Sequence, residues 1–262
     1  MKIASRWIWA VVTLAAACQS VPYTNRSRLL LVSASEEAAL GQTSYKKALA
    51  EAKLSMDDGA IATLRRVGER LAKAADKPDY QWEFNLIDDP KTINAWCLPG
   101  GKVAVYTGIL PVTQDENGLA VVLGHEIAHA LARHGSERMS QGLIANLGGA
   151  ALGAAMASKP AATQQLAQQA YGLGANVGVL LPFSRAQESE ADRIGLILMA
   201  KAGYDPSSAV GFWERMSQAS GGSGGNGLER YLRTHPADSD RIDMIKEHLP
   251  EARGYFIRTD RP

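Results

Sequence analysis

The feature that most constrains this chain is a His-Glu-x-x-His motif, His125 to His129, set in an apolar stretch typical of a buried helix. One helical turn separates the two histidines, so both imidazoles project from the same face. Two neutral imidazole nitrogens on one face can reach a single Zn²⁺ at about 2.0–2.1 Å. Glu126 then lies beside the metal as a candidate general base, which makes zinc-dependent hydrolysis the first hypothesis.

Length and charge narrow the class of protein around this motif. The chain has 262 residues, 46% of them hydrophobic, which is enough for one core and a single catalytic domain. Its formal net charge of +1 gives no sign of the basic surface that nucleic-acid binding requires, so no nucleic-acid partner is expected. The two cysteines, Cys18 and Cys97, form no Cys-x-x-Cys pair, which argues against a thiolate metal site and thioredoxin-like chemistry.

The first 34 residues are predicted to direct export. Lys2 and Arg6 precede a short apolar run that ends in small residues, as in a signal peptide, and the run is shorter than the about 20 residues of a membrane span. The segment Leu14 to Cys18 resembles a bacterial lipoprotein box, although alanine replaces a larger aliphatic residue three positions before the cysteine. We expect a signal peptide over 1–17 and a tether over 18–34 with a lipidated Cys18. The alternative is an ordinary signal peptide with an incidental cysteine.

Export and lipidation together predict a location. By resemblance to lipoproteins, Gln19 in place of an aspartate after the cysteine favours delivery to the outer membrane. We therefore expect the protein at the periplasmic face of the outer membrane, attached to the membrane through a lipid anchor only. The alternative is a soluble periplasmic protein.

Residues 35–262 are predicted to form one domain of the α+β class, mainly α. Good helix formers occupy residues 36–53, and apolar residues recur three and four apart after Asp58, so two helices are expected there. Runs with strand character predict a small antiparallel sheet beside the motif helix, at residues 82–87, 93–97 and 102–106.

Two residues bear on the motif helix itself. Thr113 and Glu116 have the spacing of a capping box, which predicts that the helix begins at Thr113. Gly124 costs about 1 kcal/mol relative to alanine in a helix interior. Its presence indicates that another backbone or a ligand comes close to the helix at that point.

Two Gly- and Ala-rich apolar stretches follow the motif helix, at residues 142–158 and 171–183. Neither reaches the roughly 18 uninterrupted apolar residues that indicate a membrane helix. We expect two helices that cover or plug the active-site cleft. The alternative is that they pack on the core, since small residues permit close approach. Residues 220–227 are almost entirely Gly and Ser and predict a flexible loop.

A zinc site needs a third protein ligand, and the segment Glu188 to Asp192 offers candidates. Glu188 and Asp192 lie four residues apart on one face of a predicted helix. Glu188 can therefore bind the metal while Asp192 orients a ligand histidine. Spacing alone leaves Glu190 as a candidate as well.

Four segments together resemble the HtpX/Oma-type zinc metallopeptidases, peptidase family M48, and especially their exported BepA/LoiP-like branch without membrane helices. The segments are Asn94 to Gly101, His125 to His129, Glu188 to Asp192, and Thr234-His235-Pro236. The resemblance implies a zincin-like fold with one Zn²⁺ bound by His125, His129 and Glu188, and with Glu126 activating water. It also implies an edge strand along which substrate lies, made of Asn94, Ala95, Trp96 and Cys97.

His235 is the remaining candidate catalytic residue. Pro236 makes it extended rather than helical, which suits a side chain that reaches into a cleft. By resemblance to exported members it lies near the metal, either stabilising the oxyanion or occupying the open position as a reversible inhibitor. The alternative is a loop histidine that hydrogen-bonds locally.

Two further polar residues stay open at this stage. His134 lies five residues after His129 and falls off the ligand face, so it is expected to be structural or solvent-facing. Arg241 could contact the site, but a solvated helix position is at least as well supported.

The predicted function is that of a zinc metalloendopeptidase. By resemblance, its polypeptide substrates would be misfolded or stalled envelope proteins, and the outer-membrane assembly machinery is a candidate partner. The competing class is a periplasmic chaperone or assembly factor for outer-membrane proteins, whose proteolysis is secondary or latent. Rescue of a deletion strain by Glu126→Gln would favour the assembly factor.

Overall fold

The structure is a computed structural model, and it describes residues 18–161, 163–165, 184–221, 231, 232, 235 and 239–256. The predicted signal peptide over 1–17 and the apolar stretch 171–183 lie outside the described residues, as does most of the predicted loop at 220–227. Among the described helices, none combines the length and apolar character that a membrane crossing demands.

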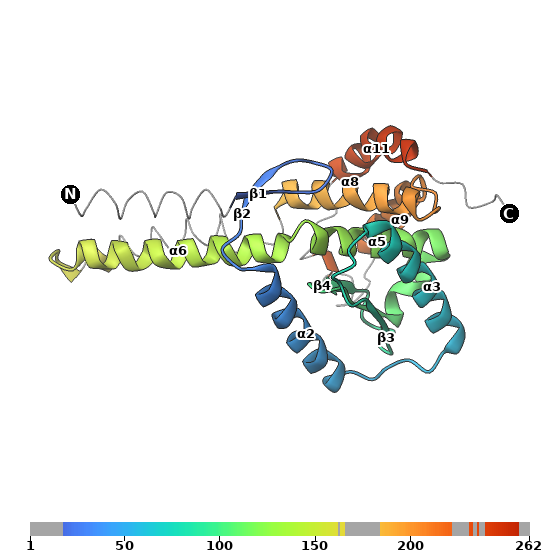
Figure 1. Cartoon of the computed structure of the whole chain (residues 1–262), viewed down its shortest axis with the longest axis horizontal. Helices are drawn as coiled ribbons and strands as arrows, with labels where there is room; N and C mark the ends of the chain where they lie inside the picture. The colour runs from blue at the N-terminus through green and yellow to red at the C-terminus, as the bar shows by residue number, and fades with distance from the viewer. Residues whose placement is uncertain are drawn as a thin grey trace.

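Two helices lie side by side at the centre of the molecule (Figure 1). The motif residues belong to these helices, α5 (Glu116–Leu131) and α8 (Arg185–Lys201). Every residue of α5 from Gly118 onward is buried, as expected for a helix that is apolar on all sides. α8 begins at a capping box between Ser184 and Gln187, and Gly203, with φ +80°, lies just beyond its end.

The two helices approach closely because two glycines face each other. A Cβ atom added to Gly124 would lie 3.0 Å from the carbonyl oxygen of Gly195. One added to Gly195 would lie 3.0 Å from the backbone nitrogen of His125. The approach predicted at Gly124 is therefore confirmed, and the approaching group is the backbone of α8.

The start of α5 differs from the prediction. Thr113 ends the short helix α4 (Leu110–Thr113), and its hydroxyl donates to the carbonyl of Leu110. Asp115 caps α5 instead, accepting the backbone N–H of Gly118 at 2.8 Å. The capping box at Thr113 is therefore wrong, because the chain makes a turn of its own before α5 begins.

The two helices predicted before the sheet are present, and a capping residue precedes each. α2 (Ala34–Glu51) starts with a capping box between Ser33 and Glu36. α3 (Asp58–Ala75) starts at Asp57, whose side chain accepts the N–H of Ala60 at 2.9 Å.

Three strands form a small sheet beside α5, in the order β3-β5-β4. They are β3 (Glu83–Ile87), β4 (Ala95–Leu98) and β5 (Lys102–Tyr106). β4 and β5 form an antiparallel hairpin, but β3 pairs parallel with β5. The predicted antiparallel pairing is thus confirmed for β4 with β5 and wrong for β3. The chain reverses twice between β3 and β5, and β5 inserts between the other two strands, which leaves β4 at an edge.

Residues 18–34 form no free tether, in contrast to the prediction. They include an antiparallel pair of strands, β1 (Cys18–Ser20) and β2 (Ser27–Leu29), which we call the N-terminal hairpin. Val21 is buried in the core. The guanidinium of Arg26 lies 2.6 Å from Glu137 and 2.8 Å from Glu190. Buried apolar contacts and ion pairs to distant segments hold the hairpin on the body, where the local composition indicated only a polar linker.

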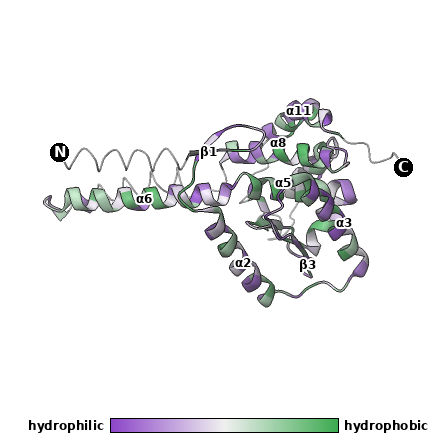
Figure 2. Ribbon diagram, viewed as in Figure 1, coloured by the Kyte–Doolittle hydropathy of each residue, from purple (hydrophilic) through white to green (hydrophobic). Residues whose placement is uncertain are grey.

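The helix α6 (His134–Met156) projects from the body as an arm (Figure 1). Its first turns are buried, but the following residues are exposed or half-buried, and Leu147 is 69% exposed. Figure 2 shows the mixture of apolar and weakly polar residues along this arm. The described residues of 142–158 therefore neither plug the site nor pack on the core, since α6 continues without a break away from the body.

The C-terminal helices complete the core around α8. They are α9 (Ser208–Gly221) and α11 (Ser239–Gly254). Earlier in the chain, the short 3-10 helix η1 (Thr107–Ile109) leads into α4. Phe212 and Ile245 are buried in the same core as α5. α11 continues past Pro250, because a proline removes one helical hydrogen bond without ending every helix.

Candidate metal centre

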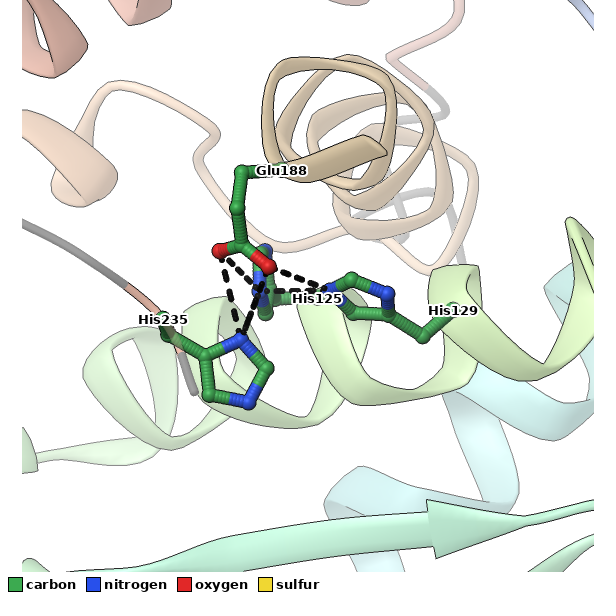
Figure 3. A group of neighbouring side chains, drawn as sticks. All are labelled: His125, His129, Glu188 and His235. Carbon is green, nitrogen blue, oxygen red and sulfur yellow. Dashed lines mark hydrogen bonds and ion pairs between the residues drawn. The ribbon is translucent and has the colours of Figure 1, made fainter. Parts of the chain in front are cut away.

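Two histidines of α5 and one glutamate of α8 converge on one point (Figure 3). His125 Nε2 lies 3.4 Å from Glu188 Oε2, and His129 Nε2 lies 3.2 Å from Glu188 Oε1. The two Nε2 atoms are 3.0 Å apart. His235 Nδ1 lies 3.1 Å from His125 Nε2 and 3.1 Å from Glu188 Oε1. All four side chains are buried, and one donor atom of each lies within 4.8 Å of the others.

The spacing of these atoms fits a divalent metal ion. In a tetrahedral zinc site with bonds of about 2.0–2.1 Å, neighbouring ligand atoms are about 3.3 Å apart. The three distances among His125, His129 and Glu188 run from 3.0 to 3.4 Å. Two imidazoles and one carboxylate are also a donor set of known catalytic zinc sites. The residues present therefore fit zinc.

The other ring nitrogens of the two α5 histidines have partners within the protein. His125 Nδ1 lies 2.8 Å from Asp192 Oδ1, and His129 Nδ1 lies 2.8 Å from His134 Nδ1. A metal-bound imidazole usually donates its remaining N–H to such a partner, which sets both its tautomer and its ring orientation. Each Nε2 atom is thereby left facing the common point.

Arg241 of α11 is a buried cation in this cluster. Its Nε and Nη2 atoms donate to the two oxygens of Asp192, each at 2.8 Å, and Nη1 lies 3.1 Å from Glu188 Oε2. The guanidinium also stacks 3.4 Å from the ring centroid of Trp213. Burial alone would lower the pKa of Arg241, but the charges of Asp192 and Glu188 raise it. The sequence left this arginine open between the site and solvent because its partners lie about 50 residues away.

Glu126 lies beside the cluster with one unused oxygen. Among the described residues, nothing donates a hydrogen bond to its buried Oε1 atom, which lies 3.5 Å from His235 Nε2. Burial raises the pKa of this carboxyl, while the positive charge of His235 and His125 would oppose that shift. An unpaired buried oxygen at this place can accept a hydrogen bond from water or from a substrate.

β4 passes beside α5 and presents an edge with no strand partner among the described residues. Ala95, Trp96 and Cys97 belong to it, and Asn94 precedes it and accepts the N–H of Ala95 at 3.0 Å. Trp96 packs edge-on against Tyr45. Burial and the nearby charge of Glu126 raise the pKa of Cys97, which therefore stays a thiol outside the metal-binding group.

Glu190 points away from the cluster, so geometry separates it from Glu188. Its Oε2 atom lies 3.0 Å from His134 Nε2. His134 itself is fully buried and contacts the ring of His129, which the sequence did not predict. The prediction assumed a continuous helix, but α5 ends at Leu131 and Arg133 adopts a left-handed φ of +51°. The chain turns there, and His134 comes back to His129.

A pair of histidines on one helix beside a carboxylate from a second helix defines a zincin-like metallopeptidase. The chain belongs to Peptidase family M48, whose sequence profile matches residues 60–249.

Relatives of two kinds match this chain. It is 41% identical over 235 residues to the mitochondrial metalloendopeptidase OMA1 of Schizosaccharomyces pombe, covering 88% of this chain and 66% of that protein. It is 31% identical over 254 residues to that of Saccharomyces cerevisiae, covering 91% and 71%. It is 33% identical over 194 residues to a putative beta-barrel assembly-enhancing protease of Vibrio cholerae, covering 69% of this chain but 37% of that protein.

These matches contradict the predicted location. The sequence placed the protein at the periplasmic face of the outer membrane through Cys18, or free in the periplasm. Relatives at 41% and 31% identity are mitochondrial by name. The prediction came from the first 34 residues alone, and a short basic and apolar segment contains too few distinctive positions to specify one compartment. The predicted membership of the exported branch is likewise not confirmed, because the chain matches both mitochondrial proteases and a bacterial assembly-enhancing protease.

Proposed function

We propose that the protein is a zinc-dependent endopeptidase, with zinc bound by His125, His129 and Glu188. The observation that carries this proposal is the convergence of their three donor atoms at 3.0–3.4 Å. Relatives named as metalloendopeptidases support the same reaction class.

The catalytic roles follow from the positions of the side chains. Zinc supplies Lewis acidity when bound, polarising a peptide carbonyl and lowering the pKa of water to about 7. Glu126 accepts the proton of the attacking water on its unpaired Oε1 atom and donates it to the leaving amine nitrogen. Asp192 and Arg241 hold the ring of His125 from behind, so that its Nε2 atom stays aimed at the metal.

His235 occupies the fourth position of the cluster. Its Nδ1 atom lies at 3.1 Å from both His125 Nε2 and Glu188 Oε1. A zinc site with four protein ligands has no place for the attacking water, whereas a catalytic site keeps one position open. Of the two near-metal roles that the sequence left open for His235, this arrangement favours the inhibitory ligand. We propose that catalysis requires the side chain of His235 to move away from the fourth ligand position.

The free edge of β4 supports an extended polypeptide as the substrate. An exposed strand edge can pair with a peptide through main-chain hydrogen bonds, with little demand on side chains. Asn94, Ala95, Trp96 and Cys97 would lie along this peptide. Unfolded or partly folded chains offer such extended segments more readily than native domains.

A second candidate function is an assembly factor whose proteolysis is latent. Two observations favour it: His235 closes the cluster, and one group of relatives is named for β-barrel assembly. Glu126→Gln separates the two functions, because an assembly factor would still rescue a deletion strain with this variant and an endopeptidase would not. If the protein is an endopeptidase, this variant should keep one zinc per chain and lose cleavage of an unfolded protein such as casein. Retained cleavage would contradict the role of Glu126.

A further inference from the structure

A buried series of polar contacts leads from His129 to the N-terminal hairpin. His129 Nδ1 lies 2.8 Å from His134 Nδ1, and His134 Nε2 lies 3.0 Å from Glu190 Oε2. Arg26 donates to the same oxygen from Nε at 3.0 Å and from Nη2 at 2.8 Å. The hydroxyl of Thr24 donates to the other oxygen of Glu190. His134 is fully buried and Glu190 is 6% exposed, so water contributes little to holding either one.

The direction of each hydrogen bond follows if His129 binds a metal through Nε2. A neutral imidazole bound in this way carries its hydrogen on Nδ1. His129 Nδ1 then donates to His134 Nδ1, which must accept and therefore carries its own hydrogen on Nε2. That N–H donates to the carboxylate of Glu190. These hydrogen bonds therefore fix one tautomer for His129, with its hydrogen on Nδ1, and one for His134, with its hydrogen on Nε2.

The other ligand histidine is held by a shorter version of the same arrangement. Asp192 accepts directly from His125 Nδ1, and Arg241 binds both oxygens of Asp192. A carboxylate paired with a guanidinium therefore stands behind each ligand histidine. Behind His129, one additional imidazole spans the distance to the carboxylate.

We propose that His134 is a positioning residue of the metal site, which fixes the tautomer and ring orientation of His129 and connects it to Glu190 and Arg26. This inference rests on the zinc site of the proposed function. It connects the N-terminal hairpin to the metal site, since Arg26 donates to the same carboxylate of Glu190 that accepts from His134. Arg26 also donates to Glu137 at the base of α6. Arg26 precedes the motif by about 100 residues, so local sequence patterns give no sign of this connection.

Zinc affinity of the full chain tests the proposal, measured by competition with a chromophoric chelator. His134→Leu keeps the apolar volume but removes both ring nitrogens, and should lower the affinity by about 10-fold or more, as loss of such outer partners does elsewhere. His134→Asn places an amide oxygen where Nδ1 accepted and should restore much of the affinity. Glu190→Gln, which changes no shape, should weaken binding in the same direction.

A matched control and a spectrum separate positioning from a loss of folding. Arg193 lies on the same helix as Glu190 but pairs outward with Glu251, so Arg193→Gln should leave zinc affinity unchanged. With cobalt(II) in place of zinc, His134→Leu should shift the visible absorption bands, and Arg193→Gln should not. If the leucine variant does not fold, Glu190→Gln decides the question.

The outcomes distinguish this inference from the function on which it rests. A wild-type chain that binds no zinc overturns the proposed function and the role of His134 with it. A wild-type chain that binds zinc, together with unchanged affinity in the His134 and Glu190 variants, overturns the positioning role alone. A loss in His134→Leu with recovery in His134→Asn supports it.

Discussion

Gly124 and Gly195 lie against each other where α5 packs on α8, with no side chain between the two backbones. His125 follows the first glycine directly, and Glu188 precedes the second by about two helical turns. The separation of the two helices at this contact therefore sets the distance between the candidate ligands.

Gly195→Ala should weaken both folding and metal binding. The added Cβ would lie 3.0 Å from backbone atoms of Gly124 and His125, which cannot rotate away. Overpacking of this kind costs about 1–3 kcal/mol, so urea unfolding should show a loss of that size, and zinc affinity should fall. Gly142→Ala is the control: nothing lies within 4 Å of its added Cβ, and alanine should stabilise that helix by up to about 1 kcal/mol. Equal effects at the two glycines would contradict the role of this contact.

His235→Ala should raise proteolytic activity. The alanine removes the fourth donor atom and frees the position that the attacking water needs. The measurement is kcat/KM on an unfolded substrate, with His248→Ala, on α11, as the control. A loss of about 100-fold or more would instead assign His235 to the oxyanion.

Removal of the metal should destabilise the fold. A ligand that binds only the folded chain stabilises it by about 2.7 kcal/mol at 100 times its Kd, so a strong chelator should lower the Tm by several degrees. His129→Ala removes one donor atom, and the chelator should then change the Tm very little. If the chelator leaves the Tm of the wild-type chain unchanged, the folded chain holds no stabilising metal.

Arg26→Ala should destabilise the folded chain far more than loss of a surface ion pair. The arginine is about one-third exposed, but its partners Glu137 and Glu190 are buried and would lose their counter-charge. We expect a cost of about 1–3 kcal/mol in urea unfolding, reduced from the fully buried case by solvent. Lys53→Ala breaks an exposed pair with Asp88 and should cost less than about 1 kcal/mol. Equal costs would indicate that residues 18–34 are a tether after all.

Local patterns predicted those parts of the fold that neighbouring residues determine. The helices α2 and α3, and the helical spacing of His125 and His129, are properties of residues one or two turns apart. The approach at Gly124 was also predictable, because a glycine inside an apolar helix lowers its stability unless a close neighbour requires the missing side chain.

The features that were missed depend on contacts between distant segments. The parallel pairing of β3 with β5 reflects the order in which strands assemble, which alternation along one strand does not reveal. The N-terminal hairpin is held by Arg26 through Glu137 and Glu190, more than 100 residues away. The contact of His134 with His129 was missed because nothing in the sequence marks the left-handed turn at Arg133.

The most direct test of the central claim is a crystal structure of the full chain grown with zinc, with anomalous diffraction recorded at the zinc absorption edge. We predict one strong peak at about 2.0–2.2 Å from Nε2 of His125, Nε2 of His129 and a carboxylate oxygen of Glu188. The absence of a peak among these three residues, or a peak held instead by Glu190, would contradict the proposed zinc site.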